Sequence, residues 1–193
     1  MHAMPEKFQT FVRDFTEVVD THHGNEPAIL EKGAAVLKTL ISQDDWLQEA
    51  YAKPHPQYYQ QYLLYLDPQE RFSVVSFVWG PGQKTPIHNH TVWALIGMMR
   101  GAEVGELFEC APAGQSMRSM GLEKLHPGDV DCVSPSIGDI HRVSNAFDDQ
   151  VSISVHVYGG NIGRISRHVF VQETSERKPF ISGYSNEAEL TPA

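Results

Sequence analysis

Two histidines separated by one residue, His88 and His90, are the first feature of this chain that could carry out chemistry. In a strand, residues two apart face the same side, so both imidazoles would point into one space. A third histidine, His141, follows 51 residues after His90. Imidazole nitrogens are common ligands of transition metals, and these three form a candidate metal site. The chain has ten histidines, so the alternative is that they are satisfied or solvated side chains without a ligand.

The residues around these histidines follow a known pattern. Five residues separate Gly82 from His88, and Gly101 ends this first half of the pattern. The second half consists of Gly128, Pro135, Gly138, His141 and Asn145. Over about residues 82–145 the sequence resembles the cupin superfamily, whose two motifs have this spacing. The resemblance implies a mainly β fold, a small barrel or jelly roll. Where many cupins have a glutamate ligand, this chain has Ala94 or Leu95, neither of which can bind a metal.

Loss of that glutamate would change the charge of the metal centre. Three neutral imidazoles leave the full double positive charge on an Fe(II) ion, whereas a site of two histidines and one carboxylate cancels part of it. Such a centre favours anionic ligands, and a thiolate is one, because metal coordination removes the proton of a thiol. Three histidines also suit Zn²⁺ with a bound water, so a zinc or nickel hydrolase or isomerase is an alternative.

A strictly alternating segment, residues 151–158, is the second candidate for chemistry. Its valines and isoleucine share one face, and the polar side chains share the other: Ser152, Ser154, His156 and Tyr158. The polar face either meets water or lines the interior of a barrel. Beside a metal, we expect Ser154, His156 and Tyr158 to form a hydrogen-bonded row in which the serine orients the histidine and the histidine tunes the phenol.

The row and the three histidines together resemble the thiol dioxygenases, cupin iron enzymes that include cysteine dioxygenase and 3-mercaptopropionate dioxygenase. Their Ser-x-His-x-Tyr motif matches Ser154, His156 and Tyr158, and the resemblance extends over about residues 58–170. It implies an Fe(II) cofactor, a small thiol and O₂ as partners, and a sulfinic acid as product. A non-catalytic cupin that only binds a ligand is the competing interpretation.

Two departures from the animal cysteine dioxygenases bear on the substrate. The cysteine that those enzymes crosslink to the tyrosine is replaced by Ala94 or Leu95, so we expect no crosslink. Those enzymes bind the substrate carboxylate with an arginine. The corresponding stretch of this chain contains Gln61 instead, which matches the glutamine of the bacterial subgroup. In that subgroup an arginine later in the chain holds the substrate carboxylate, and Arg167 matches it, with Arg164 as the rival. We therefore expect 3-mercaptopropionate as substrate, with L-cysteine as the alternative.

The surrounding sequence predicts the elements that hold these residues. Apolar residues recur at helical spacing over residues 6–20 and 26–41, and a short turn is expected within 44–50. Short β-type runs with Pro and Gly punctuation follow. The predicted strands are 58–66, 72–79, 92–99, 104–110, one before Leu125, 129–133, 141–144, 151–158 and 165–171. We expect one domain over 1–193, with a helical cap (5–50), a barrel (57–172) and a C-terminal tail laid over the barrel (173–193).

Length, charge and cysteine content exclude several other classes. A chain of 193 residues can bury a sizeable core without disulfides, and its net charge of −9 argues against nucleic acid or an anionic membrane as partner. The two cysteines, Cys110 and Cys132, form no CxxC pair, so we expect buried thiols in a reducing compartment. Without a recognisable leader or long apolar stretch, the sequence predicts a cytoplasmic protein of unknown oligomeric state.

Overall fold

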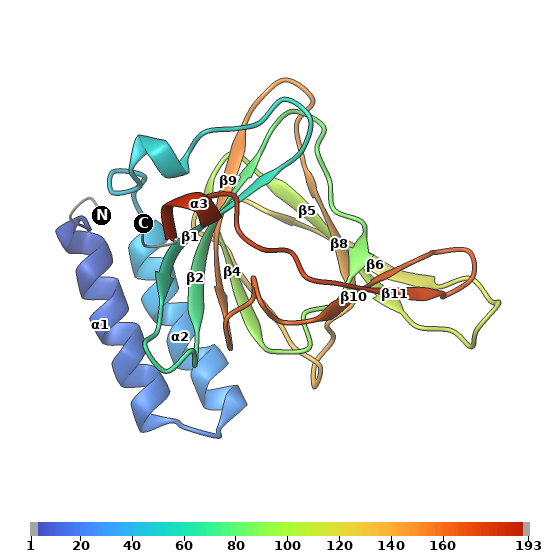
Figure 1. Cartoon of the computed structure of the whole chain (residues 1–193), viewed down its shortest axis with the longest axis horizontal. Coiled ribbons are helices and arrows are strands. Elements are labelled where there is room, and N and C mark those ends of the chain that lie inside the picture. The colour runs from blue at the N-terminus through green and yellow to red at the C-terminus, as the bar shows by residue number, and fades with distance from the viewer. Residues whose placement is uncertain (1–3, 191–193) are drawn as a thin grey trace.

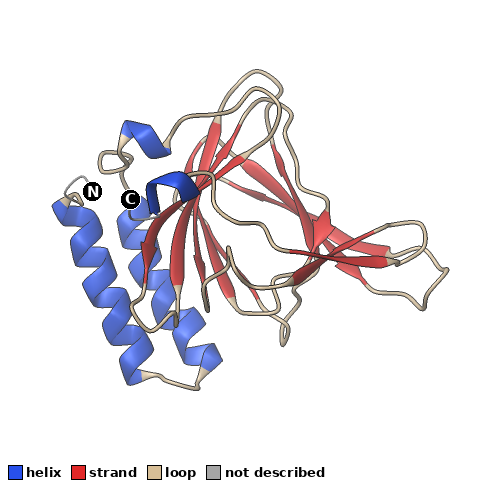
Figure 2. Cartoon of the chain, in the orientation of Figure 1, coloured by secondary structure: helices blue, strands red, loops and turns tan. Residues whose placement is uncertain are grey.

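Two antiparallel sheets face each other in the computed structural model, which describes residues 4–190 (Figures 1 and 2). The five-stranded sheet has the order β1 (Gln60–Leu66), β2 (Ser73–Trp79), β9 (Ser152–Tyr158), β4 (Ala94–Arg100) and β7 (Val130–Val133). The six-stranded sheet has the order β11 (Arg177–Phe180), β10 (Arg167–Phe170), β3 (Ile87–His88), β8 (His141–Asn145), β5 (Glu103–Glu109) and β6 (Arg118–Leu125). This is the predicted cupin barrel with the predicted helical cap.

Two helices form the cap and lie against the five-stranded sheet (Figure 1). Helix α1 spans Glu6–Thr21 and α2 spans Glu26–Ile41, close to the predicted ranges. The side chain of Asn25 caps α2 by accepting from the backbone N–H of Ala28 at 3.3 Å, and a proline lies in the first turn, where a missing N–H is harmless. The predicted short turn is the 3₁₀ helix η1 (Glu49–Tyr51), and α3 (Glu187–Leu190) ends the described chain.

The cap and the sheet share one hydrophobic core. A Cβ atom at Gly33 of α2 would lie 2.8 Å from Phe15 and 2.9 Å from Leu95, so the missing side chain lets this helix approach both α1 and β4. On the other side, Leu37 of α2 packs against Gly97 of β4. No described helix is both long enough and apolar enough to cross a bilayer.

Strand β9 separates this core from the interior of the barrel. Every residue of β9 is buried. Ile153, Val155 and Val157 belong to the core beneath the helices, whereas Tyr158 belongs to a second apolar cluster between the sheets. The polar face of β9 therefore lines the barrel interior, which is one of the two environments that its alternation allowed.

The structure differs from the sequence-based expectations in three places. Strand β3 ends at His88, so His90 lies beyond the strand that was expected to position it. The C-terminal segment contributes strand β11, which pairs with β10, where only a tail was predicted, and residues 191–193 of that tail lie outside the described residues. Cys110 is exposed and Cys132 is half-buried, so the prediction of two buried thiols was wrong.

Candidate metal centre

Three histidines converge between the two sheets. His88 ends β3 and is directly opposite His141 of β8 in the strand register, while His90 lies in the following loop. Their ring centroids are 4.8 to 5.0 Å apart, and one potential ligand atom from each lies within 4.8 Å of the others. All three side chains are buried. Within residues 4–190 this is the one cluster of three or more His, Cys, Asp or Glu side chains suited to a metal ion.

His90 is aimed at the cluster by a carboxylate that the sequence analysis did not single out, Asp139. The chain turns at Thr91, which has a positive φ of 62°, and strand alternation therefore ends before it. The oxygens of Asp139 accept from the backbone N–H groups of His90 and Thr91 at 2.9 to 3.1 Å, and from His90 Nδ1 at 2.9 Å. Its position two residues before His141 is the only sequence signal, and that signal depends on the fold of the loop.

The hydrogen bonds leave the opposite nitrogen of two rings available as a ligand. His88 Nδ1 lies 3.1 Å from the carbonyl oxygen of Pro86, to which only a protonated nitrogen can donate. His90 Nδ1 is bonded to Asp139, and its Nε2 is buried and has no hydrogen-bond partner in the part of the chain that the structure describes. An orphaned imidazole nitrogen beside two others fits a metal ion, and a carboxylate behind a ligating histidine is a common supporting arrangement.

The histidines are neutral at physiological pH, as metal ligands must be. Burial, with a smaller effect of the Arg167 charge, lowers the pKa of His88 to about 4. Burial and the neighbouring histidines lower the pKa of His90 and His141 well below the ordinary value. Burial also raises the pKa of Asp139, although its hydrogen bonds from Thr91 and His90 oppose this.

The polar face of β9 forms a continuous hydrogen-bonded row beside the cluster. Ser154 Oγ lies 2.9 Å from His156 Nε2, and His156 Nδ1 lies 2.9 Å from the hydroxyl of Tyr158. Phe77 stacks on the ring of His156 at a centroid distance of 4.2 Å and restricts its rotation. Burial lowers the pKa of His156 to about 3 and raises the pKa of Tyr158, so both are uncharged. The Tyr158 ring lies 5.5 Å from that of His90.

Ala94, rather than Leu95, occupies the interior position at which many cupins have a glutamate ligand and the animal cysteine dioxygenases have the crosslinked cysteine. In the register of β4 and β9, Ala94 is directly opposite Tyr158, whereas Leu95 faces the helical cap. A methyl group can neither ligate a metal nor form a thioether. Neither cysteine compensates, because Cys110 is exposed and Cys132 packs on the cap side of the sheet.

The two candidate arginines lie in different environments. Arg167 is 4% exposed, its Nη2 donates to Ser182 Oγ at 2.7 Å, and its Nε has no hydrogen-bond partner within the described chain. Its guanidinium stacks over Phe180, and its charge acts on His88, His90 and Tyr158. Arg164 is an exposed side chain in an ion pair with Glu187. The structure therefore brings Arg167 to the cluster and leaves Arg164 at the surface.

Gln61 lies on β1 opposite Phe77, the residue that stacks on His156. Its side-chain Nε2 donates to the carbonyl oxygen of Gly183 at 2.8 Å. The next residue back along the tail, Ser182, is the partner of Arg167. The C-terminal segment thus connects Gln61 and Arg167.

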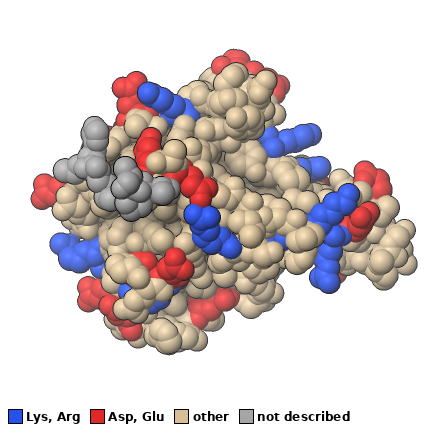
Figure 3. Space-filling model, viewed as in Figure 1, with Lys and Arg blue, Asp and Glu red and all other residues tan. Residues whose placement is uncertain are grey.

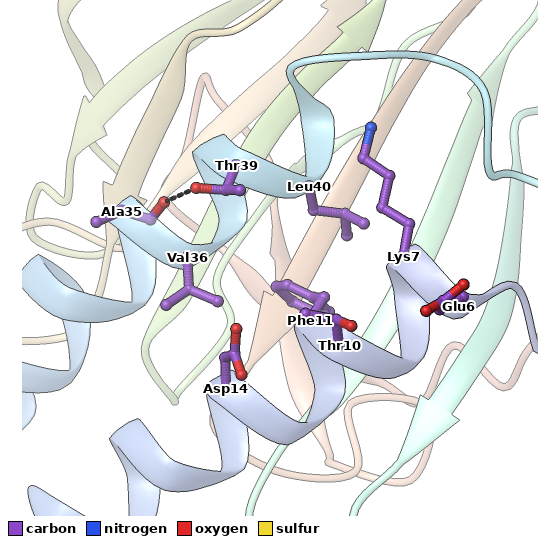
Figure 4. A pocket seen from close by; sticks show the side chains of 9 residues that line it. All are labelled: Glu6, Lys7, Thr10, Phe11, Asp14, Ala35, Val36, Thr39 and Leu40. Carbon is purple, nitrogen blue, oxygen red and sulfur yellow. Dashed lines mark hydrogen bonds between the residues drawn. The ribbon is translucent and has the colours of Figure 1, made fainter.

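Two surface hollows differ in their relation to this centre. One of about 220 Å³ is lined by His141 and Asp131 together with residues of β5 and β6. The other, of about 600 Å³, lies between α1 and α2 and includes Lys7, Phe11 and Leu40 in its lining (Figure 4). It contains none of the site residues. On the face in Figure 3, basic side chains occur singly or in small groups beside acidic ones.

Comparison with known proteins finds both similar structures and a family. A protein of known structure from Klebsiella pneumoniae subsp. pneumoniae MGH 78578, described as an uncharacterized conserved protein with a double-stranded beta-helix domain, is 18% identical, with a TM-score of 0.47 over 62% of this chain and 93% of that one. A cupin superfamily protein from Desulfitobacterium hafniense DCB-2 is 14% identical, with a TM-score of 0.45 over 62% and 94%. The family model described as cysteine dioxygenase type I matches residues 16–169. The chain therefore belongs to the cysteine dioxygenase type I family.

Proposed function

We propose that this protein is a non-haem Fe(II) dioxygenase that oxidises a small carboxylate-bearing thiol to its sulfinic acid with O₂, in the cytoplasm. The observation that carries the proposal is the buried guanidinium of Arg167, whose charge acts on His88 and His90 of the three clustered neutral histidines. Among the described residues, no carboxylate belongs to this cluster of potential ligands. A substrate with a carboxylate at one end and a thiolate at the other is complementary to this arrangement. The family assignment supports an oxygenase-type enzyme.

His88, His90 and His141 are the residues that would hold the ion. When bound, Fe(II) supplies a Lewis-acidic centre that favours the thiolate form of the substrate and the redox chemistry that activates O₂. Asp139 keeps the ring of His90 in one orientation by accepting from both its backbone and its imidazole. In the overall reaction, a thiolate and O₂ give a sulfinate: two S–O bonds form, the O–O bond breaks, and four electrons pass from sulfur to oxygen.

The protein side chains have separate tasks in this reaction. The Arg167 guanidinium pairs with the substrate carboxylate, and its planar fork fixes the direction in which the thiol extends. Ser182 and Phe180 hold that guanidinium in place. Tyr158 keeps its proton at neutral pH, so its hydroxyl can donate a hydrogen bond within the site.

We further propose that 3-mercaptopropionate is preferred to L-cysteine. The two differ by an ammonium group, which needs a carboxylate or several acceptors when it is buried. Among residues 4–190, Asp139 is the carboxylate that is hydrogen-bonded to a histidine of the cluster. Its oxygens already accept hydrogen bonds from His90 and Thr91. Gln61 is neutral and its amide is bonded to Gly183. Among the described residues, neither Asp139 nor Gln61 therefore offers a free counter-charge to the ammonium group of L-cysteine.

Steady-state oxygen consumption by the iron-loaded protein tests this proposal. The panel should contain 3-mercaptopropionate, L-cysteine and a thiol of similar size without a carboxylate. We expect kcat/KM to be highest for 3-mercaptopropionate and lowest for the uncharged thiol. A higher value for L-cysteine would overturn the substrate assignment. Absence of oxygen consumption with every thiol, together with retention of Zn²⁺ or Ni²⁺ in place of iron, would favour a hydrolase or isomerase instead.

A further inference from the structure

The barrel interior contains a carboxyl group that the proposed reaction does not use, that of Glu103. It lies at the start of β5 and is 1% exposed. One of its oxygens, Oε2, is buried and has no hydrogen-bond partner among residues 4–190. An ionised carboxylate is costly in such surroundings, whereas the protonated form carries no charge and can donate a hydrogen bond. The protonation state of Glu103 therefore determines whether its carboxyl group donates a hydrogen bond to a neighbouring side chain or only accepts one.

Glu103 lies at the end of the polar row opposite to Tyr158. The hydrogen-bonding groups of Ser154 and Trp79 are the polar side-chain groups that act on this carboxyl. The indole N–H of Trp79 also donates to Ser154 Oγ at 3.1 Å. The carboxyl group, the serine, His156 and the tyrosine thus form one chain of polar contacts across the barrel.

The number of protons in this chain allows two arrangements. Ser154 Oγ has one proton and two lone pairs, and Trp79, which can only donate, occupies one lone pair. If Glu103 is ionised, the serine donates to it and must accept from His156 Nε2. The bare Nδ1 of His156 then accepts the proton of Tyr158, which is no longer available to the site.

If Glu103 is protonated, every hydrogen bond in the chain reverses. The carboxyl donates to Ser154, and the serine proton goes to His156 Nε2. His156 then carries its proton on Nδ1 and donates to the oxygen of Tyr158. The tyrosine hydroxyl hydrogen is free to point towards the histidine cluster, where His90 is its neighbour. Both arrangements satisfy Ser154, so the proton on Glu103 selects between them.

We infer that Glu103 is a positioning residue that sets the tautomer of His156, and through it the direction in which Tyr158 donates its hydrogen bond. The inference deepens the proposed function and rests on it, because Tyr158 is the group that would act on the substrate. Glu103 itself touches neither the three histidines nor Arg167 in any hydrogen bond of the described chain.

The electrostatic surroundings of Glu103 support a change of protonation near neutral pH. Burial raises its pKa to about 7, with the carboxylate of Asp131 acting in the same direction and the hydrogen bonds of Ser154 and Trp79 opposing it. Among the described residues, the titratable groups that interact with Glu103 are Asp131 on β7 and Tyr158 on β9, and His156 follows Ser154 along the polar row. Strands β2, β6 and β8 contribute uncharged side chains: Trp79, Leu125 and Asn145.

Nuclear magnetic resonance of the ¹⁵N-labelled full chain without metal tests the inference. The ring nitrogens of His156 can be assigned from their loss in His156→Asn. As pH rises from about 5.5 to about 8.5, we expect the proton of His156 to move from Nδ1 to Nε2. In Glu103→Gln, which cannot titrate, one tautomer should persist over this range. Asp131→Asn should lower the midpoint, and Glu109→Gln, an exposed change on the same strand, should leave it unaltered.

A wild-type chain whose His156 tautomer does not change with pH would overturn the inference, and so would a change that persists in Glu103→Gln. Infrared spectroscopy of the wild type gives a readout that does not depend on the folding of a variant. A protonated-carboxyl band should disappear with the same midpoint as the tautomer change, and its absence at low pH would contradict us. A normal tautomer change in a chain that oxidises no thiol once iron-loaded would refute the proposed function alone.

Discussion

The two faces of strand β9 are equally buried, yet they make different demands on the sequence. On the cap side, Val155 and Val157 contact apolar side chains, and any residue of suitable size and shape would serve. On the barrel side, Ser154, His156 and Tyr158 must each find a hydrogen-bond partner. We therefore expect the apolar face to contribute mainly to stability and the polar face, under the proposed function, mainly to chemistry. Substitutions on and around the two faces can separate these contributions.

The largest expected effect comes from removing a metal ligand. His141→Ala deletes one of three imidazoles, and we expect iron content to fall from about one ion per chain to nearly none, with loss of all oxidation. Elemental analysis after anaerobic loading measures this. His126→Ala removes an exposed histidine and serves as the control. Normal iron retention in His141→Ala would show that this ring is not a ligand.

Removing the buried guanidinium should have the next largest effect. Arg167→Met leaves the substrate carboxylate without a partner, which costs about 2–5 kcal/mol and lowers kcat/KM at least about 30-fold. The loss should be much smaller for a thiol without a carboxylate. Arg164→Met is the matched control, since that arginine is exposed and paired with Glu187. Equal losses in the two variants would contradict the assignment of Arg167.

A change on the apolar face of β9 should affect stability alone. Val155→Ala removes two buried methyl groups beneath the cap, and we expect the free energy of unfolding to fall by about 2 kcal/mol. Iron content and kcat/KM of the remaining folded protein should stay within about twofold of the wild type. Denaturant titration and steady-state kinetics of the same sample check both parts. A large loss of activity in Val155→Ala would remove the distinction between the faces.

The complementary change on the polar face is Tyr158→Phe. It keeps the ring and deletes the hydroxyl that lies 2.9 Å from His156 Nδ1. We expect iron to be retained and kcat/KM to fall about 10- to 100-fold, the effect of losing one hydrogen bond of about 1–3 kcal/mol. Unchanged turnover would remove Tyr158 from the mechanism. Val155→Ala should thus lose mainly stability, whereas Tyr158→Phe should lose mainly activity.

The sequence predicts those parts of the molecule that depend on local pattern. The alternation from Val151 to Tyr158 identifies the two faces of β9, and helical spacing identifies α1 and α2 to within about a residue at each end. The motif spacing also identifies His88, His90 and His141 as a candidate metal site, and the fold places them together. These features are encoded by residues close in the chain or by motifs with characteristic spacing.

Features that depend on tertiary contacts could not be predicted in the same way. The direction of His90 is set by the turn at Thr91 and by Asp139, which lies 49 residues away. Glu103 directly follows Ala102 and comes just before a predicted strand that looks ordinary, and only the fold brings it near Ser154. The sequence left Arg164 and Arg167 as alternatives because they differ in their surroundings rather than in their type.

Isotopic labelling of the product tests the central claim, that three histidines of this chain support dioxygenation of a thiol. The iron-loaded protein is incubated with 3-mercaptopropionate under ¹⁸O₂, and the sulfinic acid is analysed by mass spectrometry. We expect both oxygen atoms of the sulfinate to carry the label and one O₂ to be consumed for each product. A product with one labelled oxygen or none, or O₂ uptake without sulfinate, would contradict this claim.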